Sequence, residues 1–154
     1  MAKKAPKKNE KGPGFRFMYK MGALAAIVSL VEVTLILGGL LPPVLSYSPA
    51  NIFFMLVRLA LVAYTGIAYA KQDLKISAIT GAFTAFCGTF VLTMASTLNY
   101  LYIHKTVLGV LIWSREAMFM LMMTTLLQNV AIGIAIGAIA GWLYLKFGKK
   151  HFQK

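Results

Sequence analysis

The sequence is poor in the residues that build most catalytic and metal sites. Its 154 residues include one cysteine, Cys87, and two histidines. A single cysteine provides neither an intramolecular disulfide nor a Cys-based metal site. The histidines, His104 and His151, lie far apart, and the signatures of serine hydrolases, zinc proteases and P-loop nucleotide-binding proteins are missing. We therefore expect no enzymatic activity, no catalytic residue, no metal and no cofactor.

Acidic residues are also scarce, with four Asp and Glu against sixteen Lys and Arg and a net charge of +12. In a soluble protein this excess would suggest nucleic acid as a partner. However, 59% of the residues are hydrophobic and the mean hydropathy is +0.73, which is typical of membrane proteins. The basic residues also lack the interleaved aromatics of nucleic-acid-binding modules. We expect an integral membrane protein that does not bind nucleic acid.

Four long apolar segments cover about residues 21–45, 51–70, 76–103 and 117–145. Each reaches the ~20 residues that a helix needs to cross a ~30 Å hydrocarbon core. Backbone groups in lipid must be paired within their own segment, so these segments are expected to be helices. The sequence predicts an all-α, four-transmembrane-helix bundle over residues 21–147, flanked by basic tails at 1–20 and 148–154.

The distribution of Lys and Arg predicts the orientation. Seven lie in residues 1–20, two in residues 71–75 and four in residues 146–154, whereas only Lys105 and Arg115 fall on the opposite side. The positive-inside rule then puts both termini in the cytoplasm, as in a multi-pass protein of the cell (inner) membrane. The tail 1–20 has too few apolar residues to order itself. Its lysines are expected to contact anionic headgroups, at about 1 kcal/mol each.

Two charges, Glu32 and Arg58, interrupt the first and second apolar segments. At ~1.5 Å of rise per residue they lie ~16 and ~18 Å from the same side of the membrane, so they can meet as an ion pair. An unpaired charge at that depth costs at least about 2.5 kcal/mol. Two hypotheses remain: the pair locks two helices together, or Glu32 forms the centre of a proton or substrate site.

Small residues predict where helices approach closely. Gly133, Gly137 and Gly141 form two overlapping GxxxG units in the fourth span, a pattern typical of helix contacts in lipid. Gly81 belongs to an i+4 series of small and hydroxyl residues in the third span. The spacing does not decide whether the fourth span contacts the third span of its own chain or the fourth span of a second copy.

Amides and hydroxyls are expected to form a polar layer between the third and fourth spans. Its members are Thr89, Thr93, Gln128 and Asn129. Adjacent residues on a helix differ in direction by about 100°, so one amide is expected to face the interior and the other a partner. The connection 104–117 has an apolar core too short to cross, and we expect it to lie in the interface, with a re-entrant loop as the alternative.

The stretch TGIAYA (residues 65–70), taken with Glu32 in the first of four spans, resembles the small multidrug resistance transporters. These are short four-helix dimers whose first-helix glutamate exchanges drug for protons. The likeness covers Glu32 and this stretch alone, which opens the third helix in that family but ends the second span here. It implies a proton-coupling role for Glu32.

Our first hypothesis is a protein that acts by helix packing, as a homo-oligomer or as a subunit of a larger membrane complex. The alternative is a small proton-coupled transporter centred on Glu32.

Overall fold

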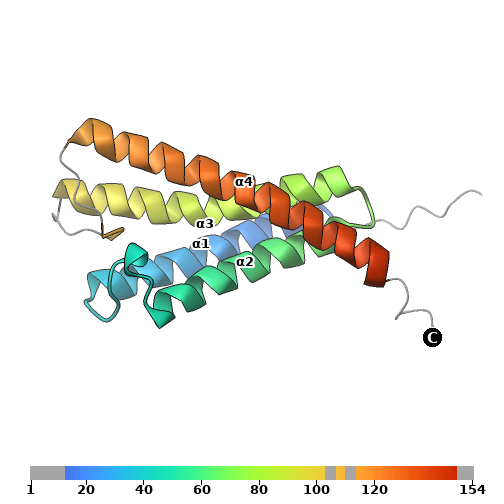
Figure 1. Cartoon of the computed structure of the whole chain (residues 1–154), viewed down its shortest axis with the longest axis horizontal. Helices are drawn as coiled ribbons and strands as arrows, with labels where there is room; N and C mark the ends of the chain where they lie inside the picture. Colours follow the sequence, from blue (N-terminus) through green and yellow to red (C-terminus); the bar gives the residue numbers. More distant parts are fainter. Residues whose placement is uncertain (1–12, 103–106, 110–113, 149–154) are drawn as a thin grey trace, which may run out of the picture.

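The protein is an all-α bundle (Figure 1) in a computed structural model that describes residues 13–102, 107–109 and 114–148. Within these ranges it has four long helices and one short 3-10 helix: α1 Phe15–Leu37, η1 Val44–Ser46, α2 Pro49–Tyr69, α3 Leu74–Tyr102 and α4 Arg115–Phe147. All four long helices have the length and apolar composition to cross a membrane. The fold is therefore that of a candidate multi-pass membrane protein.

The first helix begins earlier than the sequence predicted. Residues 15–20, expected to belong to the disordered tail, form the first turns of α1. Phe17 packs its ring against Tyr64 and Tyr69 of α2, with ring centroids 6.0 and 6.1 Å away. The Tyr69 hydroxyl also donates a 2.8 Å hydrogen bond to the Gly14 carbonyl. These contacts supply the burial that the tail composition lacks. The rest of the two predicted tails, residues 1–12 and 149–154, lies outside the described ranges.

The first helix also ends earlier, at Leu37 rather than near residue 45. Gly39 has φ +75°, a left-handed conformation that glycine adopts without a steric penalty. The amides of Leu40 and Leu41 donate back to the Leu35 carbonyl at 2.9 and 3.2 Å, which closes the end of the helix. Residues 38–48 then form a compact turn that contains η1.

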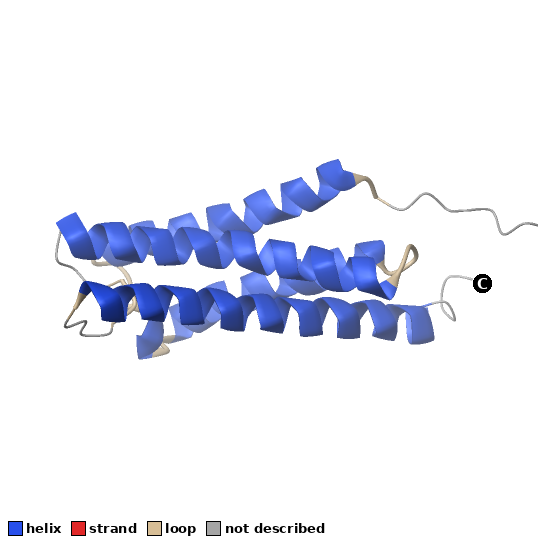
Figure 2. Cartoon of the chain, turned by 90° about the horizontal axis from the view of Figure 1, so that it is seen from above, coloured by secondary structure: helices blue, strands red, loops and turns tan. Residues whose placement is uncertain are grey.

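Helix α3 is the centre of the bundle. It contacts α1, α2 and α4, and its contact with α4 is the most extensive, whereas α1 and α4 lie diagonally opposite. Figures 1 and 2 show the α1–α2 and α3–α4 connections at one end of the bundle, called here the η1 end. The turn between α2 and α3 lies at the other end with the start of α1 and the end of α4 (Figure 1).

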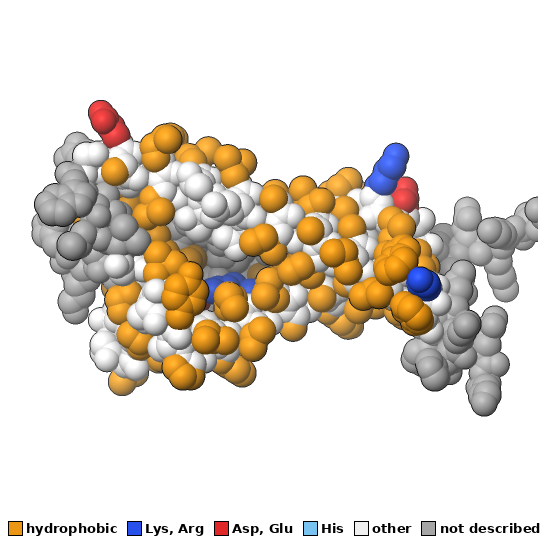
Figure 3. Space-filling model, viewed as in Figure 1, with side chains coloured by type: hydrophobic (Ala, Val, Ile, Leu, Met, Phe, Trp, Pro, Cys, Tyr) orange, Lys and Arg blue, Asp and Glu red, His pale blue; other side chains and the backbone are white. Residues whose placement is uncertain are grey.

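The outer surface of the bundle is largely apolar, and its interior holds both apolar and polar side chains. Figure 3 shows hydrophobic side chains spread over the surface between the two ends. The interior holds many buried Ser and Thr residues, most of them on α3. Thr84, Thr93 and Ser96 donate to the carbonyl four residues earlier, at 2.7 to 3.0 Å. These three hydroxyls are therefore satisfied by their own helix.

The described part of the predicted interfacial connection lies inside the bundle. Val107 and Leu108 are buried and pack in one apolar cluster with Val33, Ile36 and Leu92. Their carbonyls accept hydrogen bonds from the backbone of η1, at 3.0 and 3.2 Å. This segment therefore folds inward, because it fills the space that the short α1 leaves at the η1 end. His104 and Trp113 lie outside the described residues.

Candidate functional site

Glu32 and Arg58 form the expected ion pair between α1 and α2. The Arg58 Nη1 donates to the Glu32 Oε2 and lies 3.4 Å from the Ser29 Oγ. The Glu32 side chain is fully buried, whereas 19% of the Arg58 side chain is exposed. The carboxylate is therefore sealed inside the bundle, and the guanidinium extends from it to an open space.

The guanidinium has hydrogen-bonding capacity left over. Arginine carries five N–H donors, and both contacts of Arg58 use Nη1. Among the described residues, no acceptor contacts its Nη2 or Nε. On the other side of the pair, the buried Glu32 Oε1 has no hydrogen-bond partner within the described ranges.

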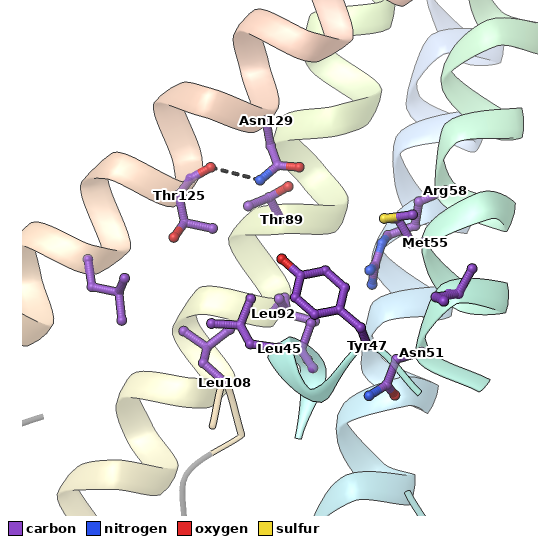
Figure 4. A pocket seen from close by; sticks show the side chains of 13 residues that line it. Leu45, Tyr47, Asn51, Met55, Arg58, Thr89, Leu92, Leu108, Thr125 and Asn129 are labelled. Carbon is purple, nitrogen blue, oxygen red and sulfur yellow. Dashed lines mark hydrogen bonds between the residues drawn. The ribbon is translucent and has the colours of Figure 1, made fainter. Parts of the chain in front are cut away.

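A cleft lies beside Arg58, with a volume of about 200 Å³. Figure 3 shows a basic side chain at the floor of a hollow in the apolar surface, and Arg58 is the basic residue that lines this cleft. The lining residues come from α2, α3, α4 and the η1 end, and Figure 4 shows their side chains converging. The polar ones are Tyr47, Asn51, Arg58, Thr89, Thr125 and Asn129.

The cleft continues past Arg58 as a narrower space of about 60 Å³ between α2, α3 and α4. Arg58, Met55, Thr89 and Asn129 line both parts. Beyond Arg58 the walls are mostly apolar, with Leu59, Val62, Ala85, Ile132 and Gly133. Tyr47, Asn51 and Thr125 therefore line only the part nearer the η1 end, while apolar side chains form most of the wall in both parts.

The four residues of the expected polar layer separate into different places. Thr89 and Asn129 both line the cleft (Figure 4), where the Asn129 Nδ2 donates to the Thr125 carbonyl at 2.9 Å. Thr93 is buried and bonds to its own helix. Gln128 is exposed on the outward side of α4. A single layer does not form, because the 100° step between adjacent helical residues directs the two amides apart.

The glycines of α4 pack inside the bundle, against α3 and α2. A Cβ built on Gly137 would lie 2.5 Å from the Ser77 carbonyl oxygen of α3, and one built on Gly81 would lie 2.5 Å from the Gly133 carbonyl oxygen. Gly133 meets Gly81 and Ala85, and Gly141 meets Ser77. Gly133, Gly137 and Gly141 therefore form a ridge on α4 that serves contacts within one chain.

Two residues that the sequence did not single out belong to these contacts. Gly66 of α2 lies against Gly137, with a built Cβ 2.5 Å from the Gly137 carbonyl oxygen. Asn51 fastens the α1–α2 turn, since its Nδ2 donates to the carbonyls of Pro42 and Pro43 at 3.1 and 2.8 Å. Gly66 stands alone without a GxxxG repeat, and Asn51 reads as an ordinary residue of a first helical turn, so the sequence offers little signal for either.

Comparison with known proteins assigns no relative. No protein-family model matches the chain, and no curated protein or solved structure matches it either. TGIAYA lies at the end of α2, and its resemblance to the small multidrug resistance transporters has no support from these comparisons. The functional argument therefore depends on the site itself.

Proposed function

We propose that the protein is a small, non-enzymatic, multi-pass protein of the cell membrane that acts by helix packing and assembles as a homo-oligomer through the outward face of α4. In this proposal the ion pair is a lock between α1 and α2. Both termini face the cytoplasm, as the excess of Lys and Arg at that end favours, and the basic tails contact anionic headgroups.

The observation that carries the proposal is the exposed amide of Gln128. It lies near the middle of α4 among exposed apolar side chains such as Met123 and Leu127, and it makes no hydrogen bond to any described residue. Thr124, one turn earlier, is exposed as well. An amide that faces lipid alone is costly, and Gln side chains in membranes typically bond across helices.

A second copy of the chain fits this face. Gln carries both donors and an acceptor, so two Gln128 side chains related by a two-fold axis satisfy each other. Ala131 and Ala135, further along α4, are exposed and small, which lets another α4 approach closely. A larger complex in which a different subunit covers this face is the other form of the packing hypothesis.

The alternative, a proton-coupled transporter, is weakened by the contact between Glu32 and Arg58. A proton carrier must change its protonation state during the cycle, and protonation of Glu32 would remove the charge-assisted bond to Arg58 that joins α1 to α2. The cleft beside Arg58 is the observation that keeps this alternative open.

Cysteine cross-linking tests the assembly. In a Cys87→Ala background, Gln128→Cys is expected to give a disulfide-linked dimer in native membranes, whereas Ile79→Cys on the exposed side of α3 stays monomeric. Gln128→Leu should weaken the dimer about fivefold, since a cross-helix hydrogen bond contributes about 1 kcal/mol or less. Gln128→Asn, which keeps an amide, should weaken it less.

Two results would redirect the hypothesis. A monomeric Gln128→Cys chain that purifies with a second protein would favour the larger complex. Proton-driven uptake into reconstituted vesicles that Glu32→Gln abolishes, with folding and assembly intact, would establish the transporter instead.

A further inference from the structure

The cleft beside Arg58 opens onto the apolar surface of the bundle, in the half that carries the η1 end (Figures 3 and 4). In a membrane, a molecule that enters there comes from the lipid rather than from water. Its charged donors are on Arg58, and the remaining polar groups are uncharged amides and hydroxyls. We infer that the cleft binds the headgroup of a zwitterionic phospholipid, with a phosphodiester at Arg58 and a primary ammonium group nearer the η1 end.

The requirement for a phosphodiester follows from the geometry of Arg58. Side chains on a helix lean toward its N-terminus, and α2 begins at the η1 end. Figure 4 shows the guanidinium directed that way, toward Asn51. The unused Nη2 and Nε donors therefore face the part of the cleft nearer the η1 end, where the oxygens of a lipid phosphate drawn below the headgroup level accept charge-assisted, often bidentate, bonds.

The charge balance of the site favours a headgroup with no net charge. Arg58 is already neutralised by the buried Glu32. An anionic ligand would leave an uncompensated negative charge at membrane depth, which costs several kcal/mol. A headgroup that brings its own cation leaves the site neutral.

The uncharged lining offers oxygens to an ammonium group. Tyr47, Thr89 and Thr125 bring hydroxyl side chains to the lining of the cleft. The Asn129 Nδ2 is taken by Thr125, which leaves its Oδ1 as the acceptor. Figure 4 shows the Tyr47 hydroxyl pointing into the cleft. A primary ammonium donates to these oxygens, whereas a quaternary one has no N–H to donate.

The shape agrees with a lipid in its normal direction. The wide part, about 200 Å³, exceeds the ~150 Å³ cavity that holds benzene in an engineered protein, so it admits a phosphate with a two-carbon amine. The narrow apolar part lies beyond Arg58, away from the η1 end. Acyl chains that leave the phosphate in the direction away from the η1 end meet those apolar walls.

A lipid competition on the unmodified chain tests this inference without depending on any variant. Phosphatidylethanolamine, its mono- and dimethyl derivatives, phosphatidylcholine and phosphatidylglycerol, all with the same acyl chains, are added at equal concentrations to the full chain in mild detergent. Native mass spectrometry counts the bound lipid. We expect binding to fall stepwise with each methyl group, by about tenfold from the primary amine to phosphatidylcholine, as hydrogen-bond donors are lost.

Three variants locate the binding. Leu121→Trp fills the cleft and should abolish the preference, and Asn129→Leu, which leaves Glu32 and Arg58 untouched, should reduce it. Ile27→Trp, on the exposed side of α1, is the matched control and should keep it. Equal binding of phosphatidylethanolamine and phosphatidylcholine, tighter binding of phosphatidylglycerol, or a preference that survives Leu121→Trp would each overturn the inference.

Discussion

Glu32 and Arg58 share one ion pair but lie in unequal surroundings. The Glu32 side chain has no exposed surface, and its Oε1 is unpartnered within the described ranges, whereas Arg58 borders the cleft. An unpaired carboxylate would therefore stay sealed in the bundle, but an unpaired guanidinium can turn into the cleft. At the scale of residues, the ion pair joins α1 to α2, but its two side chains are not equivalent.

We predict that Glu32→Gln and Arg58→Gln each lower the free energy of unfolding by about 3–5 kcal/mol, because each leaves a buried charge without its partner. Arg58→Gln should be the more damaging, since the carboxylate that it strands is the fully buried group. The double variant should recover much of the loss.

Unfolding titrations of the two single variants and the double variant in detergent measure this coupling as a double-mutant cycle. Losses that simply add would mean that the two side chains are energetically independent, and the lock would have to be abandoned.

At the scale of elements, the bundle is held where three helices cross at glycines. Gly66 of α2, Gly81 of α3 and Gly137 of α4 meet with their backbones so close that none has room for a Cβ. Contacts between backbones at this distance supply van der Waals packing, which is the main attraction between helices in lipid. The ridge on α4 is therefore occupied by its own chain, and the proposed dimer must use the opposite face.

Gly137→Leu is predicted to destabilise the fold by about 3 kcal/mol, the upper end of the range for overpacking, because its new side chain meets the backbone of α3 at Ser77 and Gly81. Ala60→Leu adds the same side chain at an exposed position of α2 and should change stability by no more than about 0.5 kcal/mol. Unfolding titrations and native mass should be measured on both.

The oligomeric mass should stay the same wherever the Gly137→Leu chain remains folded. A loss of dimer at unchanged stability would instead show that the ridge holds two chains together.

At the scale of the whole molecule, the bundle has a largely apolar outer surface and an interior in which polar and apolar side chains are mixed, with α3 at its centre. Such a distribution suits a lipid environment, because hydroxyls that bond to their own helix can be buried without water. The α1–α2 and α3–α4 connections lie at the η1 end, whereas the start of α1 and the end of α4 lie at the opposite end (Figure 1). The molecule therefore has two distinct ends.

The orientation of these two ends across the membrane is testable by labelling single cysteines in a Cys87→Ala background. An impermeant thiol reagent added to sealed cells should label Tyr47→Cys at the η1 end. It should not label Ala5→Cys, Lys71→Cys or Phe152→Cys until the membrane is permeabilised, because the positive-inside rule predicts that these positions lie in the cytoplasm. Labelling of residue 5 or 152 from outside would reverse the orientation.

Much of the architecture could be predicted from the sequence. The number and approximate position of the helices follow from the length of the apolar segments, since lipid leaves the backbone no other way to pair its polar groups. The meeting of Glu32 and Arg58 was predictable because both depth and the short turn between their helices are properties of spacing along the chain. The ends of α1 were not, because they depend on the ring contacts of Phe17 and on the left-handed Gly39.

The sequence by itself determined the membrane class of the chain, its four helices and the common depth of Glu32 and Arg58. These features follow from hydropathy and from the rise per residue, and both quantities can be read from one segment of the chain at a time. Only the tertiary structure decided what faces what. It put the glycines of α4 inside, separated Gln128 from Asn129, and opened a cleft beside Arg58. These outcomes depend on how each helix is rotated about its axis and on how far α2 and α4 diverge. Both the rotation and the divergence result from the packing of side chains from all four helices, so no single segment of the sequence determines them.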